Sequence, residues 1–323
     1  MLSAAVAGDE QAFVQLTAPL RRRLHVHCYR MLGSVHDADD ALQETMLRAW
    51  RGIGRFEPRG ELSAWLYRIA TNVCLRMLEQ RRRTPAAVSA HLEPYPDVLL
   101  QTETPEGEAE RREAVGLAFV AAMQLLSPRQ RAVLVLRDVL DWSAREVADA
   151  LGVSVAAANS ALQRARHRLE RERREGTLAR AHRPTDDGAE AALMHRFVEA
   201  WEAVDIDGLS ELLAGDALMT MPPDPFRALG AEAITGFFAT VPMGGRLDLI
   251  LLRPTRANGQ PALAAYVQES AGDPYRAYGI MVFAVAGPDI TGITGFAGKP
   301  DLYPLFDLPL ELPASAGRDP SLA

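Results

Sequence analysis

The stretches DADDALQETMLRAW (37–50) and ELSAWLYRIATNVCLRMLEQRRR (61–83) decide how the first half of this chain folds. In both stretches apolar residues recur every three or four positions, which is the spacing of an amphipathic helix. Between them lies RFEPRG (55–60), where Pro58 and Gly60 break helicity. The sequence therefore predicts two helices joined by a short loop.

The first of these helices has two chemically different faces. Its predicted apolar face comprises Ala38, Ala41, Leu42, Met46, Ala49 and Trp50. The opposite face carries charged residues, namely Asp37, Asp40, Glu44 and Arg48. Acidic residues in a first turn also suit the positive end of the helix dipole. We expect this outer face to bind a basic protein surface.

The second helix combines a buried face with a polar row. Its predicted buried residues are Leu62, Trp65, Leu66, Ile69, Val73 and Met77. Arg68, Asn72 and Arg76 follow one another at intervals of four residues on the other side, and Phe56 and Arg59 lie in the preceding loop. Arginine, amide and aromatic side chains together are typical of a surface that binds single-stranded nucleic acid.

Length and composition indicate a multidomain protein of the cytoplasm. A chain of 323 residues with 48% hydrophobic residues has material for two or three hydrophobic cores. No apolar run approaches the ~18 residues that a membrane-spanning helix needs, and the N-terminus does not have the pattern of a signal peptide. The two cysteines do not form a disulfide framework, so we expect a reducing compartment.

Charge is divided unevenly along the chain. Residues 1–183 contain 27 arginines against 23 acidic residues, a net charge of +4. Residues 184–323 contain 8 basic against 19 acidic residues, a net charge of −11. The first half can therefore bind nucleic acid although the whole chain is acidic, and the last domain can compete for arginine-rich surfaces.

Two linkers separate the predicted domains. In residues 84–113 four prolines and seven acidic residues interrupt the helical periodicity, so this segment is either a passive tether or lies along a partner surface. Residues 177–188 form the second linker.

His25, His27, Cys28 and His36 could together suggest a metal site, but a zinc site normally needs four ligands. We therefore expect these residues to take part in ordinary helix packing. We expect neither a metal nor a cofactor.

The stretch WSAREVADALGVSVAAANSALQRARHRLE (142–170) predicts a helix-turn-helix. Ser143 and Glu146 have the spacing of a capping box, and Gly152 follows as the turn. Ser154 caps a second helix whose inner face is Ala158, Leu162, Ala165 and Leu169. The side chains predicted to reach DNA are Arg145, Asn159, Ser160, Gln163, Arg164 and Arg166. The alternative is a helical hairpin with a solvated charged face.

The last part of the chain predicts a small α+β domain. Helical patterns at 189–205, 207–215 and 231–241 are followed by strand-like runs after Gly244 and Gly245, with a turn at Asn258-Gly259. The residues after Lys299 are rich in proline and are expected to form a tail.

The helical half resembles the extracytoplasmic-function group of bacterial sigma factors. DADDALQETMLRAW is similar to the family's polymerase-docking helix, and ELSAWLYRIATNVCLRMLEQRRR to its promoter-melting helix. LSPRQRAVLVLRDVLDWSAREVADALGVS with ALQRARHRL is similar to the domain that reads the −35 element. The recognition helix departs from the family pattern, because Asn159 and Ala161 stand where Lys and Arg are usual. This departure puts the contact set and the preferred sequence in question.

The C-terminal part resembles the cone-shaped SnoaL-like fold found behind some sigma factors, through MPPDP (221–225) and GAEAITGFF (230–238). Enzymes of that fold use a His or Asp inside the cone. Here His195 and Asp216 do not form an acid–base pair in the sequence pattern, so we predict no catalytic residue.

The resemblance implies two all-α sigma domains followed by an α+β cone-shaped SnoaL-like domain. The predicted divisions are region 2 at 8–83, a linker at 84–113, region 4 at 114–176, a linker at 177–188, the SnoaL-like domain at 189–300 and the tail at 301–323. The implied partners are core RNA polymerase, through Asp37, Asp40, Glu44 and Arg48, and promoter DNA. The −10 element would contact Phe56, Arg59, Arg68, Asn72 and Arg76, and the −35 element would contact the helix-turn-helix.

The resulting prediction is an alternative-type sigma factor whose C-terminal domain modulates its activity. Two other functions stay open at this point: a ligand-responsive helix-turn-helix regulator, and a SnoaL-like enzyme with a DNA-binding appendage. A small ligand in the C-terminal domain is a further candidate partner. Sequence does not decide whether an anti-sigma factor exists.

Overall fold

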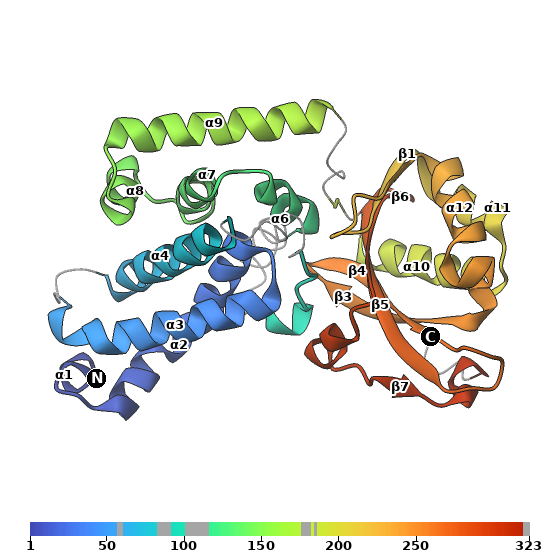
Figure 1. Cartoon of the computed structure of the whole chain (residues 1–323), viewed down its shortest axis with the longest axis horizontal. Helices are drawn as coiled ribbons and strands as arrows, with labels where there is room; N and C mark the ends of the chain where they lie inside the picture. The colour runs from blue at the N-terminus through green and yellow to red at the C-terminus, as the bar shows by residue number, and fades with distance from the viewer. Residues whose placement is uncertain (57–60, 83–91, 101–115, 176–181, 184–185, 319–323) are drawn as a thin grey trace. The chain divides into compact units, whose positions relative to one another are not determined.

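The computed structural model describes residues 1–56, 61–82, 92–100, 116–175, 182–183 and 186–318, which belong to two units (Figure 1). The first unit comprises Met1–Glu93 and Val120–Glu175, and the second comprises Pro94–Phe119 and Gly176–Ala323. The second unit therefore includes part of the predicted first linker. No helix in the described residues has both the length and the apolar character needed to cross a membrane.

The N-terminal part of the first unit is a helical bundle in which three helices pack against one another (Figure 1). After the short α1 (Leu2–Val6) come α2 (Glu10–Leu32), α3 (Val35–Gly52) and α4 (Leu62–Arg82), with a 3₁₀ turn at Ile53–Arg55. Gly33 has a φ of +81° at the end of α2, a conformation that glycine adopts without a steric penalty. Ser34 then caps α3 by accepting a hydrogen bond from the Asp37 amide at 3.1 Å.

Burial along α3 confirms its predicted apolar face, whereas the buried face of α4 differs from the prediction. On α3, Ala38, Ala41, Leu42, Met46 and Ala49 are buried, and Trp50 is half-buried. On α4 the fully buried residues are Leu66, Ala70, Thr71, Val73, Cys74 and Leu78. Trp65, Ile69 and Met77 are only half-buried. Small residues form much of this interface and let the helices approach closely, whereas the prediction gave weight to large apolar residues.

The C-terminal part of the first unit contains the predicted helix-turn-helix. α6 (Leu117–Gln124) leads to α7 (Pro128–Leu134) and a π-helical turn at Val135–Val139, which are followed by α8 (Ala144–Leu151) and α9 (Val155–Arg174). Ser143 and Glu146 form the predicted capping box, and Gly152 has a φ of +63° at the turn. Ser154 caps α9 through a hydrogen bond from the Ala157 amide at 3.1 Å.

The second unit is a curved sheet with helices on one face (Figure 1). Its helices are α10 (Asp187–Glu202), α11 (Ile206–Glu211) and α12 (Ala231–Thr240). Its strands are β1 (Leu213–Thr220), β2 (Arg227–Leu229), β3 (Ile250–Ala257), β4 (Gln260–Val267), β5 (Tyr275–Ala286), β6 (Asp289–Ala297) and β7 (Glu311–Leu312). The strand order is β2-β1-β6-β5-β4-β3, with β7 paired to β5, and only β1 and β6 run parallel among these pairs.

Aromatic side chains build the core between the helices and the sheet. Phe197 and Trp201 of α10 stack with ring centroids 5.9 Å apart, and Phe238 of α12 meets Trp201 edge-on at 5.1 Å. Phe283 of β5 contacts Phe197 from the sheet side at 5.0 Å. Each of these residues is at most 2% exposed, so together they remove a large apolar area from water.

The structure corrects two expectations about the second unit. The predicted helix 207–215 ends at Glu211, and Gly215 and Asp216 lie in strand β1 rather than after a helix. The segment after Lys299 is not a simple tail either. It forms a 3₁₀ helix at Pro300–Phe306, and it contributes strand β7.

Tyr303 shows how the final segment is held. Its hydroxyl lies 2.5 Å from the Ala265 carbonyl oxygen and accepts the amides of Tyr278 and Gly279, each at 3.2 Å. Burial raises the pKa of this hydroxyl, and the hydroxyl joins strands β4 and β5 to the segment that follows the sheet.

Candidate polymerase-, DNA- and linker-binding surfaces

The charged face of α3 is present, but its members differ in their surroundings. Asp40 is exposed. Asp37 is ion-paired with Arg81 of α4, so this carboxylate also connects two helices. Glu44 accepts a hydrogen bond from Arg48 Nε at 2.6 Å, one turn along the helix. The structure therefore places the four predicted residues on one helix and shows that three of them already form ion pairs.

The polar row on α4 faces outward as predicted. Arg68, Asn72 and Arg76 are all exposed, and the Asn72 side chain donates a hydrogen bond to the Arg68 carbonyl at 2.9 Å. Phe56 is half-buried, with its ring centroid 5.2 Å from that of Trp65. This contact packs the Phe56 ring against α4. Arg59, the remaining predicted −10 residue, lies outside the described residues.

The outer face of α9 presents the predicted reading residues to solvent. Asn159, Ser160, Gln163, Arg164 and Arg166 are exposed, as is Arg145 on α8. The inner face is buried at Ala158, Leu162 and Ala165. Arg166 donates two hydrogen bonds to Asp138, at 2.7 and 3.1 Å, and these bonds raise its pKa. Arg166 thus fastens α9 to the preceding π-helical turn in addition to facing solvent.

A polar groove separates α4 from the helix-turn-helix within the first unit. It has a volume of about 740 Å³, and its walls include Asn72 and Arg76 of α4 and Arg164 of α9. Residues predicted for the −10 and −35 elements therefore line one hollow in this arrangement.

Arg131 of α7 ties the two halves of the first unit together. It is 4% exposed and donates hydrogen bonds to the Met31 carbonyl and, at 2.7 Å, to Gln124 Oε1. Desolvation, together with the charge of Arg81, lowers the pKa of Arg131 to about 10. Burying a guanidinium against neutral acceptors costs desolvation free energy. The contact is therefore stable only when these hydrogen bonds are correctly formed.

The residues considered for a metal site have other partners. His25 lies 3.1 Å from Asp39, His27 lies 2.9 Å from the Thr71 hydroxyl, and His36 lies 3.1 Å from Glu93. Burial lowers the pKa of His27 to about 3, so this imidazole stays neutral at physiological pH. Within the described residues no three His, Cys, Asp or Glu side chains gather as metal ligands would.

The first linker is bound at its beginning within the first unit. Glu93 accepts hydrogen bonds from the Ser34 hydroxyl at 2.7 Å and from the Val35 amide at 2.9 Å, next to the N-terminus of α3. The Tyr29 hydroxyl donates to the Glu93 carbonyl at 2.8 Å. This part of the linker therefore has fixed polar contacts and is not a passive tether.

Two residues further on, the linker is bound to the turn between β3 and β4 in the second unit. The Tyr95 amide donates to Asn258 Oδ1, and the Asn258 amide donates to the Tyr95 carbonyl, both at 2.8 Å. Tyr95 and Asn258 are completely buried. Asp97 then accepts the Gly259 amide at 2.7 Å and lies 3.4 Å from Arg256.

The same turn also binds the far side of the linker. Gln260 accepts the Leu117 amide at 2.8 Å and donates to the Phe283 carbonyl at 2.9 Å, so its side chain is anchored in the sheet. We call Arg256, Asn258, Gly259 and Gln260 the hairpin clasp. It holds the described segments on both sides of residues 101–115.

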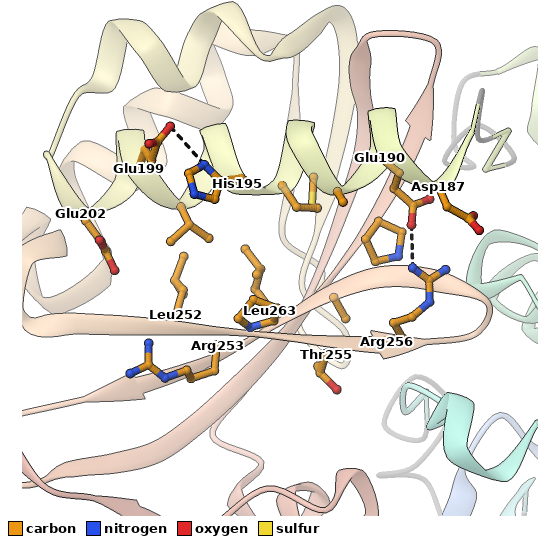
Figure 2. A pocket seen from close by; sticks show the side chains of 16 residues that line it. Asp187, Glu190, His195, Glu199, Glu202, Leu252, Arg253, Thr255, Arg256 and Leu263 are labelled. Carbon is orange, nitrogen blue, oxygen red and sulfur yellow. Dashed lines mark hydrogen bonds and ion pairs between the residues drawn. The ribbon is translucent and has the colours of Figure 1, made fainter. Parts of the chain in front are cut away.

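Figure 2 shows the ion pair that joins Arg256 of the clasp to Glu190 of α10. Arg256 donates to Glu190 at 2.6 Å, and His182 of the second linker lies 3.0 Å from the other Glu190 oxygen. The Val285 amide donates to His182 Nδ1 at 3.2 Å, which assigns the imidazole proton to the nitrogen that faces Glu190. Burial raises the pKa of Glu190, but the hydrogen bonds from His182 and Arg256 outweigh it and leave this pKa lowered.

The groove drawn in Figure 2 does not show an arrangement suited to acid–base catalysis. It has a volume of about 730 Å³ between α10 and the β3–β4 hairpin. His195 is 62% exposed and ion-paired with Glu199 at 3.3 Å, and Arg253 points away from the helix (Figure 2). Asp216 is exposed on β1. The two residues weighed as catalytic are thus solvated.

Sequence reasoning did not identify the clasp. It predicted the turn at Asn258-Gly259, but the partners of that turn lie more than 140 positions away in the chain. The signal available in the sequence was the pairing of a turn-forming Asn-Gly with a Tyr-Pro-Asp segment in an otherwise acidic linker.

Comparisons with known proteins show to which family this chain is similar. The model of sigma-70 region 2 matches residues 16–84, and the model of sigma-70 region 4 matches residues 116–169. The ECF RNA polymerase sigma factor SigG of Mycobacterium tuberculosis is 43% identical over 313 residues, covering 91% of this chain and 83% of SigG. SigM of the same species is 37% identical over 171 residues, covering 53% of this chain and 82% of SigM.

A solved structure extends the likeness to the second unit. The crystal structure of the Mycobacterium tuberculosis extracytoplasmic function sigma factor SigJ aligns with a TM-score of 0.64 and 26% identity. The alignment covers 92% of this chain and 99% of SigJ. The predicted order of two helical sigma regions followed by an α+β domain is confirmed. By its similarity to SigG over nearly the whole chain, the protein belongs to the extracytoplasmic-function RNA polymerase sigma factors.

Proposed function

We propose that the exposed side of α3 binds core RNA polymerase and that this chain thereby directs promoter-specific initiation in the cytoplasm. Asp40 is the central residue of the proposed contact because its carboxylate is exposed. Asp37, Glu44 and Arg48 complete the surface and are already ordered by ion pairs. Ordered charges lose less conformational entropy when a partner binds.

We infer that α4 and α9 contact the two promoter elements. On α4, Arg68, Asn72 and Arg76 would bind the melted −10 strand, together with Phe56 and Arg59 from the preceding loop. On α9, the amides of Asn159 and Gln163 can recognise adenine, and Arg164 can recognise guanine or a phosphate. The observation that carries this proposal is the exposed polar face of a fully capped helix-turn-helix.

We infer further that regions 2 and 4 separate before DNA is bound. Elements about 25 base pairs apart lie roughly 85 Å apart on B-form DNA at ~3.4 Å per pair. Asn72, Arg76 and Arg164 line a single groove of about 740 Å³, so one duplex cannot engage both sets in this arrangement. Spin labels on Glu79→Cys and His167→Cys test this, because the native Cys28 and Cys74 are buried. The distance between the labels should lengthen when core polymerase is added.

The second unit is proposed to modulate this separation through the hairpin clasp. Residues 95–97 and 117 belong to the chain that connects region 2 to region 4, and the clasp holds them on both sides. Holding both sides shortens the distance that the connecting chain can span. Disruption of the clasp should therefore change promoter activity. Run-off transcription with and without an intact clasp measures this change.

Two alternative functions are less well supported. A ligand-responsive regulator without polymerase would leave α3 and the region 2 match unexplained. For an enzyme, the exposed His195 and Asp216 offer no paired acid and base, and we propose that the chain has no catalytic activity. Co-purification with core polymerase distinguishes the sigma factor from the first alternative.

A further inference from the structure

A cavity opens inside the second unit, separate from the groove of Figure 2. It has a volume of about 170 Å³ and lies between α12 with the turn that follows it and strands β4, β5 and β6. Aromatic side chains form part of its wall, among them Trp201, Phe237, Phe238 and Phe296. This space is close to the ~150 Å³ of an apolar cavity that takes up a benzene-sized molecule.

The chemistry of this wall excludes charged ligands. The described residues that line it include no Asp, Glu, Lys, Arg or His. Met219, Met221 and Met281 add flexible thioether side chains, which adapt to ligands of different outline. A charged group placed here would lose its hydration without gaining a partner.

Some of the side chains that line the cavity are also exposed to water. Val241 is 56% exposed, Met243 is 38% exposed and Tyr278 is 46% exposed, and all three line the cavity. The cavity is therefore open to solvent on the side of these residues, and a ligand can reach it without unfolding of the domain.

The turn after α12, which contributes to the cavity lining, has an unusual backbone conformation. Met243 has a φ of +50°, which is rare for a residue with a long side chain, and Gly245 follows with a φ of +83°. A Cβ on Gly245 would lie 2.2 Å from the Ala239 carbonyl oxygen, so glycine is required there. Strained turns of this type are concentrated at ligand-binding sites.

We propose that this cavity binds a small uncharged molecule with one aromatic or alicyclic ring. The groove of Figure 2 does not provide an equivalent site, because ion-paired Glu190, Arg256 and Glu199 lie along it. The volume limits the ligand to about the size of a substituted benzene. The proposal does not depend on the proposed polymerase contact.

The test uses the full chain and two probes of nearly equal shape. Acetophenone is neutral, whereas benzoate carries a carboxylate in place of the acetyl group. Binding is measured by saturation-transfer NMR and by the shift of the unfolding temperature. Acetophenone should bind and benzoate should bind at least about tenfold more weakly, since burying its charge is costly.

Gly295 of β6 is a position at which an added side chain can partly fill the cavity. Its built Cβ would lie 3.5 Å from Met221 Cγ, an ordinary contact, and both residues line the cavity. Gly295→Leu should lower acetophenone affinity at least about tenfold, because overfilled sites are strained. Gly295→Ala is the milder variant if the leucine variant does not fold, and it should weaken binding measurably.

Ala191→Leu is the matched control, because Ala191 is exposed on α10 and lines the groove of Figure 2 instead. It adds apolar volume to the other hollow and should leave acetophenone binding unchanged. Three results would overturn the proposal: no acetophenone binding, equal binding of benzoate, or undiminished binding by the folded Gly295 variants. A loss of binding in Ala191→Leu alone would assign the probe to the groove and would overturn it too.

Discussion

Arg256 on strand β3 and Glu190 on helix α10 form an ion pair of 2.6 Å at the point where both linkers meet the second unit. Glu190 is 4% exposed, and its other oxygen lies 3.0 Å from His182 of the second linker. Arg256 also lies 3.4 Å from Asp97 of the first linker. The Glu190 carboxylate therefore connects α10 to the hairpin clasp and to the second linker, and Arg256 extends this network to the first linker.

The first prediction concerns the pH dependence of this ion pair. The folded-state pKa of Glu190 is lowered from its ordinary value of 4.5, so its contribution to stability is complete above that pH and is lost as pH falls through the folded pKa. Glu190→Gln cannot make this contribution at any pH. The free energy of unfolding of wild type should thus exceed that of the variant at neutral pH, and the difference should shrink below pH 4.5.

Urea unfolding followed by tryptophan fluorescence at a series of pH values measures that difference. His195→Gln, at an exposed position on the same helix, is the control and should show no such trend. A difference that stays constant from neutral to acidic pH would contradict the assignment of Glu190 as an ionised partner.

The second prediction concerns the clasp residue Asn258. Asn258→Ala removes the acceptor of the Tyr95 amide and leaves that buried donor without a partner, which costs about 1–3 kcal/mol. Asn258 also has a φ of +58°, so alanine adds backbone strain. Asn258→Gly separates the two effects, because it relieves the strain but still removes the side-chain acceptor.

Hydrogen exchange of the Tyr95 amide is the appropriate readout. Both variants should exchange this amide faster than wild type, because neither keeps a side-chain acceptor for it. Unchanged protection in the glycine variant would show that the side-chain bond does not hold the linker.

Local sequence patterns predicted the helical elements well, for physical reasons. Capping by Ser143 and Ser154 and the αL turn at Gly152 are decided within a few residues, so they could be read directly. The same holds for the apolar face of α3. Strand β1 was missed because LAGDALMT has little β-branched character and follows directly on a helix.

Tertiary contacts could not be predicted in the same way. The contact of Tyr95 with Asn258 joins residues 163 positions apart, and neither residue has a local pattern that requires the other. The proline-rich segment after Lys299 has the composition of a coil, yet Leu302, Tyr303 and Phe306 are buried against the sheet. The exposure of Asn72, Gln163 and Arg164 agrees with their predicted DNA contacts, which remain to be tested.

The third prediction concerns polymerase binding. Asp40→Arg replaces an exposed carboxylate on α3 with a cation, so attraction to a basic surface becomes repulsion. The affinity for core polymerase should fall at least about tenfold, with most of the loss disappearing at high salt. Size-exclusion co-elution and a titration of labelled protein measure this effect.

Glu10→Arg is the matched control, because it makes the same change of charge at an exposed position on α2. It should bind core polymerase almost as wild type does. Equal losses for the two variants would mean that net charge, and not the α3 face, governs the interaction.

The fourth prediction concerns the reading of the −35 element by α9. Alanine at Gln163 or Arg164 should cost about 1–3 kcal/mol of DNA binding and relax preference at one base position, if each side chain contacts a base edge. A uniform loss across sequences would indicate a phosphate contact. Arg166→Ala should also loosen α9, since Arg166 is bonded to Asp138.

Binding of each variant to a library of −35 sequences separates these effects, and circular dichroism reports the stability of the helices. His167→Ala, at an exposed position that was not assigned to a base, is the control. If none of these substitutions changed binding, the outer face of α9 would be a solvated surface and not a reading surface.

Promoter-directed initiation is tested most directly by transcription of a randomised promoter library by core RNA polymerase with and without this chain. Sequencing of the RNA 5′ ends identifies the start sites whatever the promoter sequences are. With the chain present, we predict new start sites that share two sequence blocks near −10 and −35, and these sites should disappear with Asp40→Arg. If the chain adds no start sites to those of core polymerase alone, the assignment as a promoter-directing sigma factor is contradicted.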